Sequence, residues 1–151
     1  MSATMPIATK DLSLIDAFGS ALEGIALLNR EFDRSLKAEA GIPLTWFEAL
    51  LRLHREGEPV PVGLLGEQLV LTSGGATRLV DRLADEGYVE RLACPTDRRI
   101  QHIALTDAGT AVFERALEVH IADLERLFGA ATTPADRDDL IRIFGALRSC
   151  S

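Results

Sequence analysis

Cysteine and histidine are scarce in this sequence. Its 151 residues include two cysteines, Cys94 and Cys150, and three histidines, and none of them has the spacing of a metal site. Two distant cysteines in a chain without a secretory leader do not imply a disulfide. We therefore expect neither a metal site nor a disulfide framework.

Long apolar runs and catalytic motifs are also lacking. No uninterrupted run of 18 apolar residues occurs, and the N-terminus has no basic segment followed by an apolar one, so we expect no membrane span and a cytoplasmic protein. No glycine-rich phosphate loop follows a strand, and no Ser-His-Asp arrangement or histidine cluster is indicated. The sequence therefore indicates no enzyme and no cofactor.

An excess of positive charge is missing as well. The net charge is -7, which by itself counts against a partner with a phosphate backbone. Between Arg78 and Arg99 lie five arginines and five acidic residues, so this region is neutral. Any such interface must therefore segregate its cations in space and depend on a few well-placed contacts.

What the sequence does contain is a clear capped amphipathic helix over residues 71–87. The hydroxyl of Thr72 can accept a hydrogen bond from the first turn, and Gly87 suits the left-handed residue that ends a helix. Apolar residues recur at helical spacing, which predicts one buried face. These apolar residues are Ala76, Leu79, Val80 and Leu83.

The exposed face of this helix carries small, hydroxylated and basic residues in its first half. A helix that enters the DNA major groove needs close backbone approach, hydroxyls for phosphates or bases, and an arginine able to make two hydrogen bonds to guanine. Arg78 suits the guanine contact, and Arg82, one turn later, suits a phosphate. The alternative is an ordinary surface helix whose arginines pair with Asp81, Asp85 or Glu86.

Two short alternating segments follow, at residues 88–92 and 101–105, and both have the pattern of half-buried strands. Turn-forming residues separate them, so the pair predicts a β-hairpin. Arg98 and Arg99 lie at its tip, and a guanidinium on a protruding loop suits the narrow, negative minor groove of A/T-rich DNA. Asp97 cannot contact phosphate, so we expect it to fix the shape of the loop.

A hairpin directly after a recognition-type helix is the wing of a winged helix-turn-helix. The run TRLVDRLADEGYVER, the following PTDRR and the LTDAG of residues 105–109 resemble the MarR family of transcriptional regulators. That family's pattern has a recognition helix ending in Leu-x-x-x-Gly, an aliphatic-x-Arg strand, an Asp-x-Arg wing and a Leu-Thr-x-x-Gly entry to the next helix. Chain length and helix order also fit, over nearly the whole sequence.

The resemblance implies a homodimer held by the terminal helices, with a small-molecule pocket between this dimer base and the DNA-reading head. A ligand there would change the spacing of the two heads. Hydroperoxide sensors of the family carry a reactive cysteine near the start of the chain, and this sequence has none before Cys94. Redox sensing through an early cysteine is therefore not indicated.

The remaining helices are predicted on both sides of this region. Apolar residues at steps of three and four over about 11–40 predict a helix too long for one small domain, so part of it should pack on a partner subunit. Thr45 and Glu48 have the spacing of a capping box for the next helix. The short helix at 62–69 contains two glycines, for which close helix packing is the one available explanation. Residues 106 and 133 cap the last two helices, and residues 1–10 read as a loose tail.

Together these features predict a mainly α fold with a small β-hairpin wing. We expect a single domain over residues 1–151, with a DNA-binding core at about 44–105 and dimerisation helices at about 11–40 and 106–149. The predicted DNA-binding residues are Thr72, Ser73, Gly74, Gly75, Thr77, Arg78, Arg82, Asp97, Arg98 and Arg99. Trp46, Phe47 and His54 are candidates for the effector pocket, but core or surface packing is the favoured explanation for each, so no ligand-binding residue is assigned.

The predicted function is a ligand-responsive repressor that binds a palindromic operator as a homodimer. Two alternatives stay open. The fold could serve protein contact, because the chain is acidic, or a redox switch could act through Cys94 at the base of the wing. The effector, the operator and the choice between repression and activation are not encoded in any motif.

Overall fold

The structure is a computed structural model that describes residues 9–149. Residues 1–8 of the predicted tail and Cys150 lie outside the described residues. The last two residues predicted for the tail belong to the first helix, which begins at Thr9. The elements in chain order are α1 (Thr9–Ser35), the π-helical turn η1 (Leu36–Ala40), α2 (Leu44–Glu56), β1 (Val60–Pro61), α3 (Val62–Gln68), α4 (Ser73–Asp85), β2 (Val89–Ala93), β3 (Gln101–Leu105), α5 (Asp107–Asp123), the π-helical turn η2 (Leu124–Gly129) and α6 (Pro134–Arg148).

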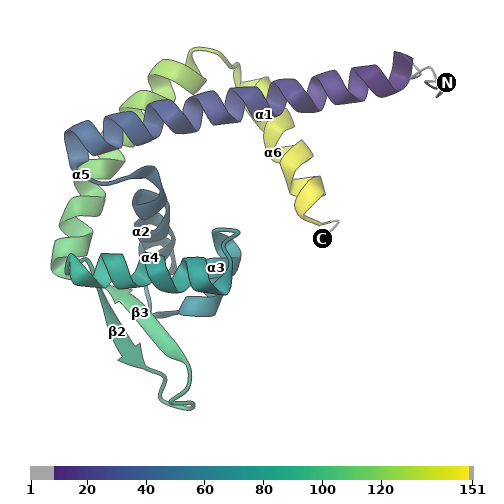
Figure 1. Ribbon diagram of the computed structural model, residues 1–151. Helices are drawn as coiled ribbons and strands as arrows, with labels where there is room; N and C mark the ends of the chain where they lie inside the picture. The colour runs from purple at the N-terminus through teal and green to yellow at the C-terminus, as the bar shows by residue number, and fades with distance from the viewer. Residues whose placement is uncertain (1–8, 150–151) are drawn as a thin grey trace, which may run out of the picture.

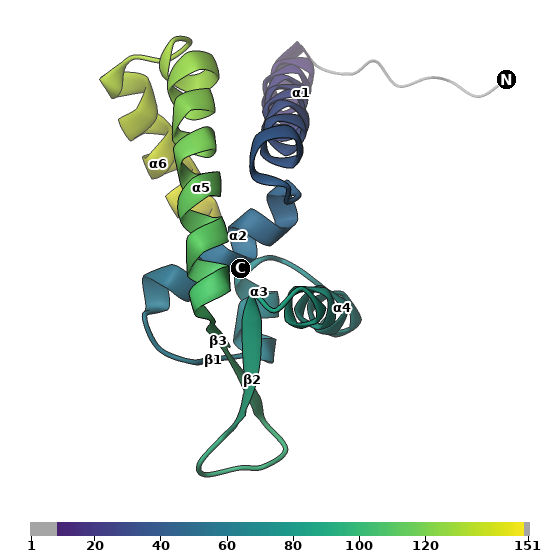
Figure 2. The same cartoon turned by 90° about the vertical axis from the view of Figure 1, so that its left-hand side faces the viewer.

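The chain has two parts, which Figures 1 and 2 show from two sides. We call α2 through β3 the head, and α1, α5 and α6 with their π-helical turns the base. The β2–β3 hairpin projects from the head on the side away from the far ends of α1 and α5. This arrangement leaves both α4 and the hairpin accessible on the surface.

A three-stranded antiparallel sheet supports the hairpin, in the order β1-β3-β2. The predicted hairpin is therefore confirmed, with Val89 opposite Leu105 and Ala93 opposite Gln101. The short strand β1, which pairs Val60 with Ile103, was not predicted. The expectation that both hairpin strands are half-buried is wrong for β2, where only Val89 is buried and the four residues after it are exposed.

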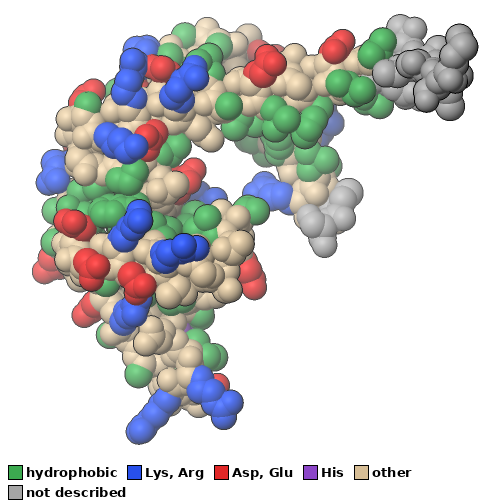
Figure 3. Space-filling view, in the orientation of Figure 1, with side chains coloured by type: hydrophobic (Ala, Val, Ile, Leu, Met, Phe, Trp, Pro, Cys, Tyr) green, Lys and Arg blue, Asp and Glu red, His purple; other side chains and the backbone are tan. Residues whose placement is uncertain are grey.

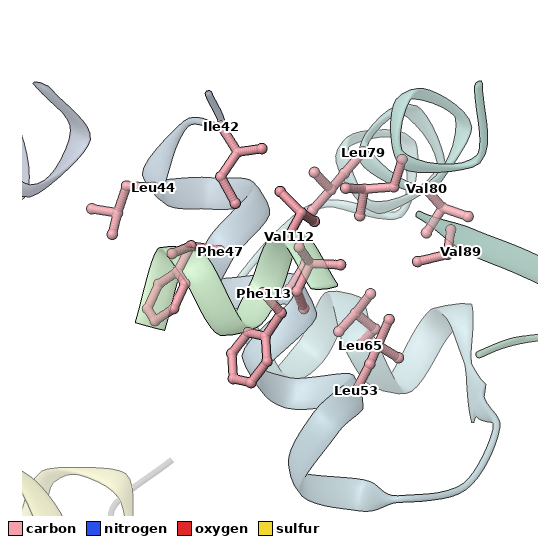
Figure 4. Packing of buried hydrophobic residues seen from close by; sticks show 14 of the residues in the cluster. Ile42, Leu44, Phe47, Leu53, Leu65, Leu79, Val80, Val89, Val112 and Phe113 are labelled. Carbon is pink, nitrogen blue, oxygen red and sulfur yellow. The ribbon is translucent and has the colours of Figure 1, made fainter. Parts of the chain in front are cut away.

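The core lies where the head meets the inner ends of α1 and α5 (Figure 4). Its largest fully buried side chains come from η1 and the following loop, from α2, α3 and α4, from β3 and from α5, so burial of apolar surface joins the head to the base. They are Leu36, Ile42, Phe47, Leu50, Leu65, Val80, Leu83, Ile103, Val112 and Phe113.

Most predicted helix ends are confirmed. Thr72, Thr106 and Thr133 each cap a helix by accepting a hydrogen bond from the backbone N–H three residues later. Gly87 is left-handed, with φ +76°. Local capping signals therefore predicted the starts of these three helices correctly.

The capping box predicted at Thr45 is wrong. Helix α2 begins two residues earlier than this cap implies, at Leu44, with Pro43 as its cap and no side-chain capping bond. Instead the N–H of Leu44 donates to Asp33 Oδ1 at 3.0 Å, so a carboxylate of α1 satisfies this helix end. A hydrogen bond from Lys37, together with that from Leu44, holds the pKa of Asp33 below its usual value.

One of the two glycines in α3 has a packing reason. A Cβ at Gly66 would lie 2.9 Å from the Cβ of Ala76, so α3 and α4 approach each other too closely for a side chain. Nothing in the structure explains Gly63, which has open space around it.

A second tight contact joins the wing to the base. A Cβ at Gly109, in the first turn of α5, would lie 1.9 Å from the carbonyl oxygen of Tyr88. Thr106 also donates its hydroxyl to the carbonyl oxygen of Gly87 at 2.6 Å and its N–H to that of Tyr88 at 3.1 Å. The end of α4, the start of β2 and the start of α5 therefore meet at one junction.

The outer parts of the base expose apolar side chains. In α1 these include Leu14, Ile15 and Phe18, and α6 has no buried residue at all. By length and composition alone the helical stretch Leu12–Ala40 is long and apolar enough to cross a membrane. The lack of an uninterrupted apolar run had led us to expect no such stretch. A single helix that meets these criteria is weak evidence for a span.

Candidate nucleic-acid interface

Helix α4 buries one face and presents the other. Ala76, Leu79, Val80 and Leu83 are buried, as the periodicity predicts. The predicted contact residues of this helix are exposed, except Gly75, which is half-buried. A Cβ at Gly75 would lie 3.1 Å from Thr72 Oγ1, the atom that accepts the hydrogen bond from the Gly75 N–H, so the cap itself favours glycine here.

The arginines of α4 do not pair with the acids of their own helix. Asp81 forms an ion pair with Arg91 of β2, which ties the wing to the helix. Arg78 instead donates from Nε to the carbonyl oxygen of Gly74 at 3.2 Å, and this contact leaves its terminal nitrogens available. Within residues 9–149, Arg82 forms no ion pair. The alternative of a neutralised surface helix is therefore not supported.

The hairpin tip is shaped by Asp97, as predicted. Its Oδ1 accepts a hydrogen bond from the Arg99 N–H at 2.9 Å, and its carbonyl oxygen accepts one from the Ile100 N–H at 3.0 Å. Arg98 and Arg99 are exposed, and neither is ion-paired in the part of the chain described. Figure 3 shows blue, basic side chains at the far end of the hairpin.

Two surface hollows bring the predicted residues together in groups. Thr77 of α4 and Arg99 of the wing line one hollow of about 550 Å³, together with Arg91 and Gln101. Arg78, Arg82 and Gly75 line another of about 350 Å³. Arg91 and Gln101 were not predicted to lie at this surface, because their position beside α4 depends on how the hairpin packs against that helix.

Trp46 also lies at this surface and not in an internal pocket. It lines the hollow that contains Arg78 and Arg82, and its ring meets that of Tyr88 edge-on at 6.2 Å. His54 packs against Phe113, with ring centroids 4.6 Å apart. Neither residue therefore lines the cavity between head and base.

That cavity has a volume of about 380 Å³ and is lined from both parts of the chain. Phe47 forms part of its wall, as do Phe32 of α1, His120 of α5 and Gln68 of α3. His120 Nδ1 and Gln68 Oε1 are buried and have no hydrogen-bond partner among the described residues. Such atoms can form hydrogen bonds with a guest in a cavity whose wall contains both apolar and polar side chains. Its other lining residues are Asn29, Leu44, Glu48, Leu51, Arg52, Leu69 and Val70.

Two titratable side chains that line this cavity, His120 and Glu48, have shifted pKa values. Burial lowers the pKa of His120, and the nearby carboxylate of Asp123 only partly opposes this shift. Loss of hydration raises the pKa of Glu48, and the positive charge of Arg52 partly offsets the shift. Both shifts favour the neutral forms, as expected for groups that lose contact with water.

Cys94 lies buried at the base of the wing as a free thiol. Its Sγ is 3.3 Å from Thr96 Oγ1, and this hydrogen bond is the main cause of a lowered pKa. Among residues 9–149, no three His, Cys, Asp or Glu side chains come together as a metal site.

A short helix packed tightly against a second, exposed helix and followed by an Arg-tipped hairpin defines a winged helix-turn-helix. The comparisons with known proteins agree with this class. The chain belongs to the MarR family, whose members are transcriptional regulators, and residues 40–100 match the family model.

Three similar proteins illustrate the relationship. The Bacillus subtilis HTH-type transcriptional regulator YkoM is 31% identical over 103 residues, covering 68% of this chain and 66% of YkoM. The Escherichia coli transcriptional repressor MprA is 32% identical over 118 residues, covering 78% of this chain and 66% of MprA. The crystal structure of Sco3205, a MarR family regulator from Streptomyces coelicolor in complex with DNA, superimposes with a TM-score of 0.83 at 25% identity, covering 98% and 91% of the two chains. Across the relatives matched by sequence, this chain spans about half to two thirds of their length.

Proposed function

We propose that this protein is a cytoplasmic, homodimeric DNA-binding repressor whose affinity for a palindromic operator changes when a small molecule binds. It has no catalytic role in this proposal. The observation that carries it is the set of exposed arginines on α4 and on the hairpin tip, which are not neutralised by neighbouring carboxylates. Cations left unpaired on two protruding elements suit a phosphate-rich partner.

Within this proposal the contacts divide by chemistry. Arg78 reads a guanine edge, while Gly74 and Gly75 permit close approach of the backbone. Arg82 contacts a phosphate, and Arg98 and Arg99 enter the minor groove. The hydroxyls of Thr72, Ser73 and Thr77 complete the phosphate contacts, and Asp97 keeps the hairpin tip in shape.

A second copy of the chain completes the binding unit. The exposed apolar residues of α1 and α6 form a surface that a single chain leaves in water, and burying it against a second copy stabilises the pair. A two-fold dimer would present two α4 helices to successive major grooves, about 34 Å apart. The operator would then be roughly palindromic.

The test begins with selection of bound fragments from random or genomic DNA, followed by fluorescence anisotropy at several salt concentrations. Arg78→Ala should cost about 1 to 3 kcal/mol and relax base preference at one operator position. Arg82→Ala should weaken binding to all sequences alike and flatten the salt dependence, whereas Arg99→Ala should chiefly weaken sites with A/T-rich flanks.

Arg142→Ala serves as the matched control, because Arg142 lies on α6 and pairs only with Asp139 among the ion pairs described. It should leave DNA affinity unchanged. The same uniform loss for all three head arginines would show that Arg78 does not read bases and that the wing does not enter the minor groove.

The cavity between head and base supports the effector part of the proposal. Its wall combines aromatic rings with the unpartnered His120 Nδ1 and Gln68 Oε1, as expected for a site that holds and orients a small molecule. A ligand there contacts both parts and can change their relative position. Screening compounds for release of the selected DNA tests this step.

A redox response through Cys94 is a second candidate, favoured by the lowered pKa of its thiol at the base of the wing. Cys94→Ser should then abolish any effect of peroxide on DNA binding. An unchanged peroxide response in this variant eliminates the candidate. Binding that is weak and independent of salt would instead favour a role in protein contact.

A further inference from the structure

The turn between α3 and α4 contains a residue in a conformation that usually requires glycine. Val70 has φ +56° and is the one non-glycine residue within 9–149 with a positive φ. A β-branched side chain in this region crowds its own backbone, which disfavours the conformation by on the order of tenfold. Its side chain is 92% exposed, so packing does not compensate for this strain.

The hydrogen bonds of the turn explain why Val70 is left-handed. The N–H of Leu71 donates to the carbonyl oxygen of Gly66 at 2.8 Å, and that of Val70 donates to Glu67 at 3.1 Å. These two hydrogen bonds form the usual C-terminal cap of a helix, in which the residue after the cap is left-handed. Glycine usually occupies that position, and here Val70 does. The bonds on both sides of Val70 therefore hold it in a strained state.

The same turn lies between the cavity and the DNA-reading helix. Gln68, Leu69 and Val70 form part of the cavity wall. Two residues after Val70, Thr72 caps α4. Gly66 packs directly on Ala76, so α3 and α4 cannot separate locally without breaking this contact. Only Leu71 and Thr72 separate Val70 from the first residue of α4, so a change in the backbone of Val70 would be passed on to the first turn of that helix.

We propose that Val70 is a positioning residue that keeps the α3–α4 turn in balance between the strained conformer and a relaxed one, and that occupancy of the cavity shifts this balance. The strained conformer presents α4 for DNA, and the relaxed conformer displaces its first turn. This inference rests on the proposed function for its DNA readout. The turn itself can be examined without DNA.

The strain and the apolar surface of Val70 can be separated by three substitutions. Val70→Gly and Val70→Asn both favour a positive φ, although only Asn retains a side chain. Val70→Thr keeps the branched Cβ, and therefore the strain, but removes an apolar methyl group. If strain matters, the Gly and Asn variants differ from the wild type and the Thr variant does not; if apolar surface matters, all three variants differ from the wild type.

Hydrogen exchange measures the turn directly. In the Gly and Asn variants the amide of Leu71 should exchange about tenfold more slowly than in the wild type, because the turn opens less often. The Thr variant should match the wild type. Equal exchange in all four proteins would overturn the proposal, whether or not the protein binds DNA.

Anisotropy with the selected DNA measures the consequence for binding. Val70→Gly and Val70→Asn should bind several-fold more tightly than the wild type, and Val70→Thr should not. If the wild type binds no DNA, the proposed function fails while the exchange result stands. If the wild type binds and the Gly and Asn variants bind with the same affinity, the positioning role is wrong.

A cavity-filling substitution tests the link to the cavity without a known effector. Leu51 lines the cavity from α2, so Leu51→Trp fills it, with Leu51→Met as the volume-conserving control. Leu51→Trp should weaken DNA binding, and the loss should be several-fold smaller when Val70→Gly is also present. The same loss in both backgrounds shows that the turn and the cavity are uncoupled. Leu51→Phe replaces the Trp variant if circular dichroism shows that the latter does not fold.

Discussion

Helices α4 and α6 are similar in sequence pattern and differ in what surrounds them. Both are amphipathic, both begin with a threonine cap, and they contain 13 and 15 residues. Helix α4 buries four apolar residues, whereas α6 buries none. An apolar stripe in a sequence therefore indicates that a helix packs against a partner surface, but it does not indicate whether the same chain provides that surface.

The difference assigns separate sources of stability to the two parts. The head and the inner ends of α1 and α5 share a packed core, so they are stabilised within one chain. Helix α6 and the outer half of α1 carry exposed apolar residues such as Phe18, Ile141 and Phe144. Figure 3 shows hydrophobic side chains, in green, along the outer part of α1. Their stabilisation should depend on association, and therefore on protein concentration.

The largest expected effect comes from the head. Leu83→Ala removes a fully buried side chain of α4 and should lower the free energy of unfolding by about 2 to 5 kcal/mol, through lost apolar burial and the cavity left behind. Urea denaturation at two protein concentrations measures it. A cost below about 1 kcal/mol would mean that the core around α4 does not hold the head together.

The next effect tests the base. Phe144→Asp places a charge on the exposed apolar face of α6 and should raise the dissociation constant of the proposed dimer by on the order of 30-fold, the size of loss that follows when a buried interface residue is changed. Analytical ultracentrifugation measures this constant. Arg142→Ala, on another face of α6, is the control and should leave association unchanged. A monomeric wild type would remove the basis for the comparison.

The two threonine caps provide a smaller, matched pair. Thr72→Ala and Thr133→Ala each remove an acceptor for a helix N-terminal N–H and should each destabilise their helix by about 1 kcal/mol. Only Thr72→Ala should also weaken DNA binding, because α4 carries the predicted contacts. Thermal unfolding and anisotropy on both variants separate these effects, and equal DNA affinities would argue against a role for the start of α4.

The smallest effect concerns the boundary between head and base. His120 lies between Phe32 and Phe47, with ring centroids at 4.8 and 4.6 Å, and burial lowers its pKa from 6.5. Its contribution to stability is therefore complete above pH 6.5 and is lost as the pH falls through the lowered value, because the unfolded chain takes up the proton first.

Denaturation at a series of pH values measures this slope, and His120→Asn should remove it. The carboxylates of Asp33 and Asp136, whose pKa values are lowered from 3.8, stabilise the fold above pH 3.8 and lose this contribution only as the pH falls below that value, so they add no slope near the titration of His120. An identical slope in the His120→Asn variant would assign the pH dependence to other groups.

How much the sequence revealed depended on how far apart the interacting residues lie. The caps at Thr72 and Thr106 and the turn at Gly87 are local, and they were predicted correctly. The start of α2 was not, because its partner, Asp33, lies 11 residues before Leu44. Strand β1 was missed because it has two residues and pairs with β3 some forty positions later.

The site followed the same rule. Periodicity placed Arg78 and Arg82 on the exposed face of α4, but no pattern could show that Asp81 pairs with Arg91 of the wing and not with them. The cavity was beyond prediction, since His120 and Gln68 come from distant helices and meet only after folding. Among the three candidates for a pocket, only Phe47 lines it.

The junction around Gly109 has a mechanical consequence. Because Tyr88 contacts α5 closely and Thr106 is hydrogen-bonded to Gly87, the start of α5 is held rigidly against the wing and the end of α4. A tilt of α5 would then move α4 and the hairpin together, because both are fixed to its first turn. Even a methyl group at residue 109 would clash with the carbonyl group of Tyr88 and force α5 away from the wing.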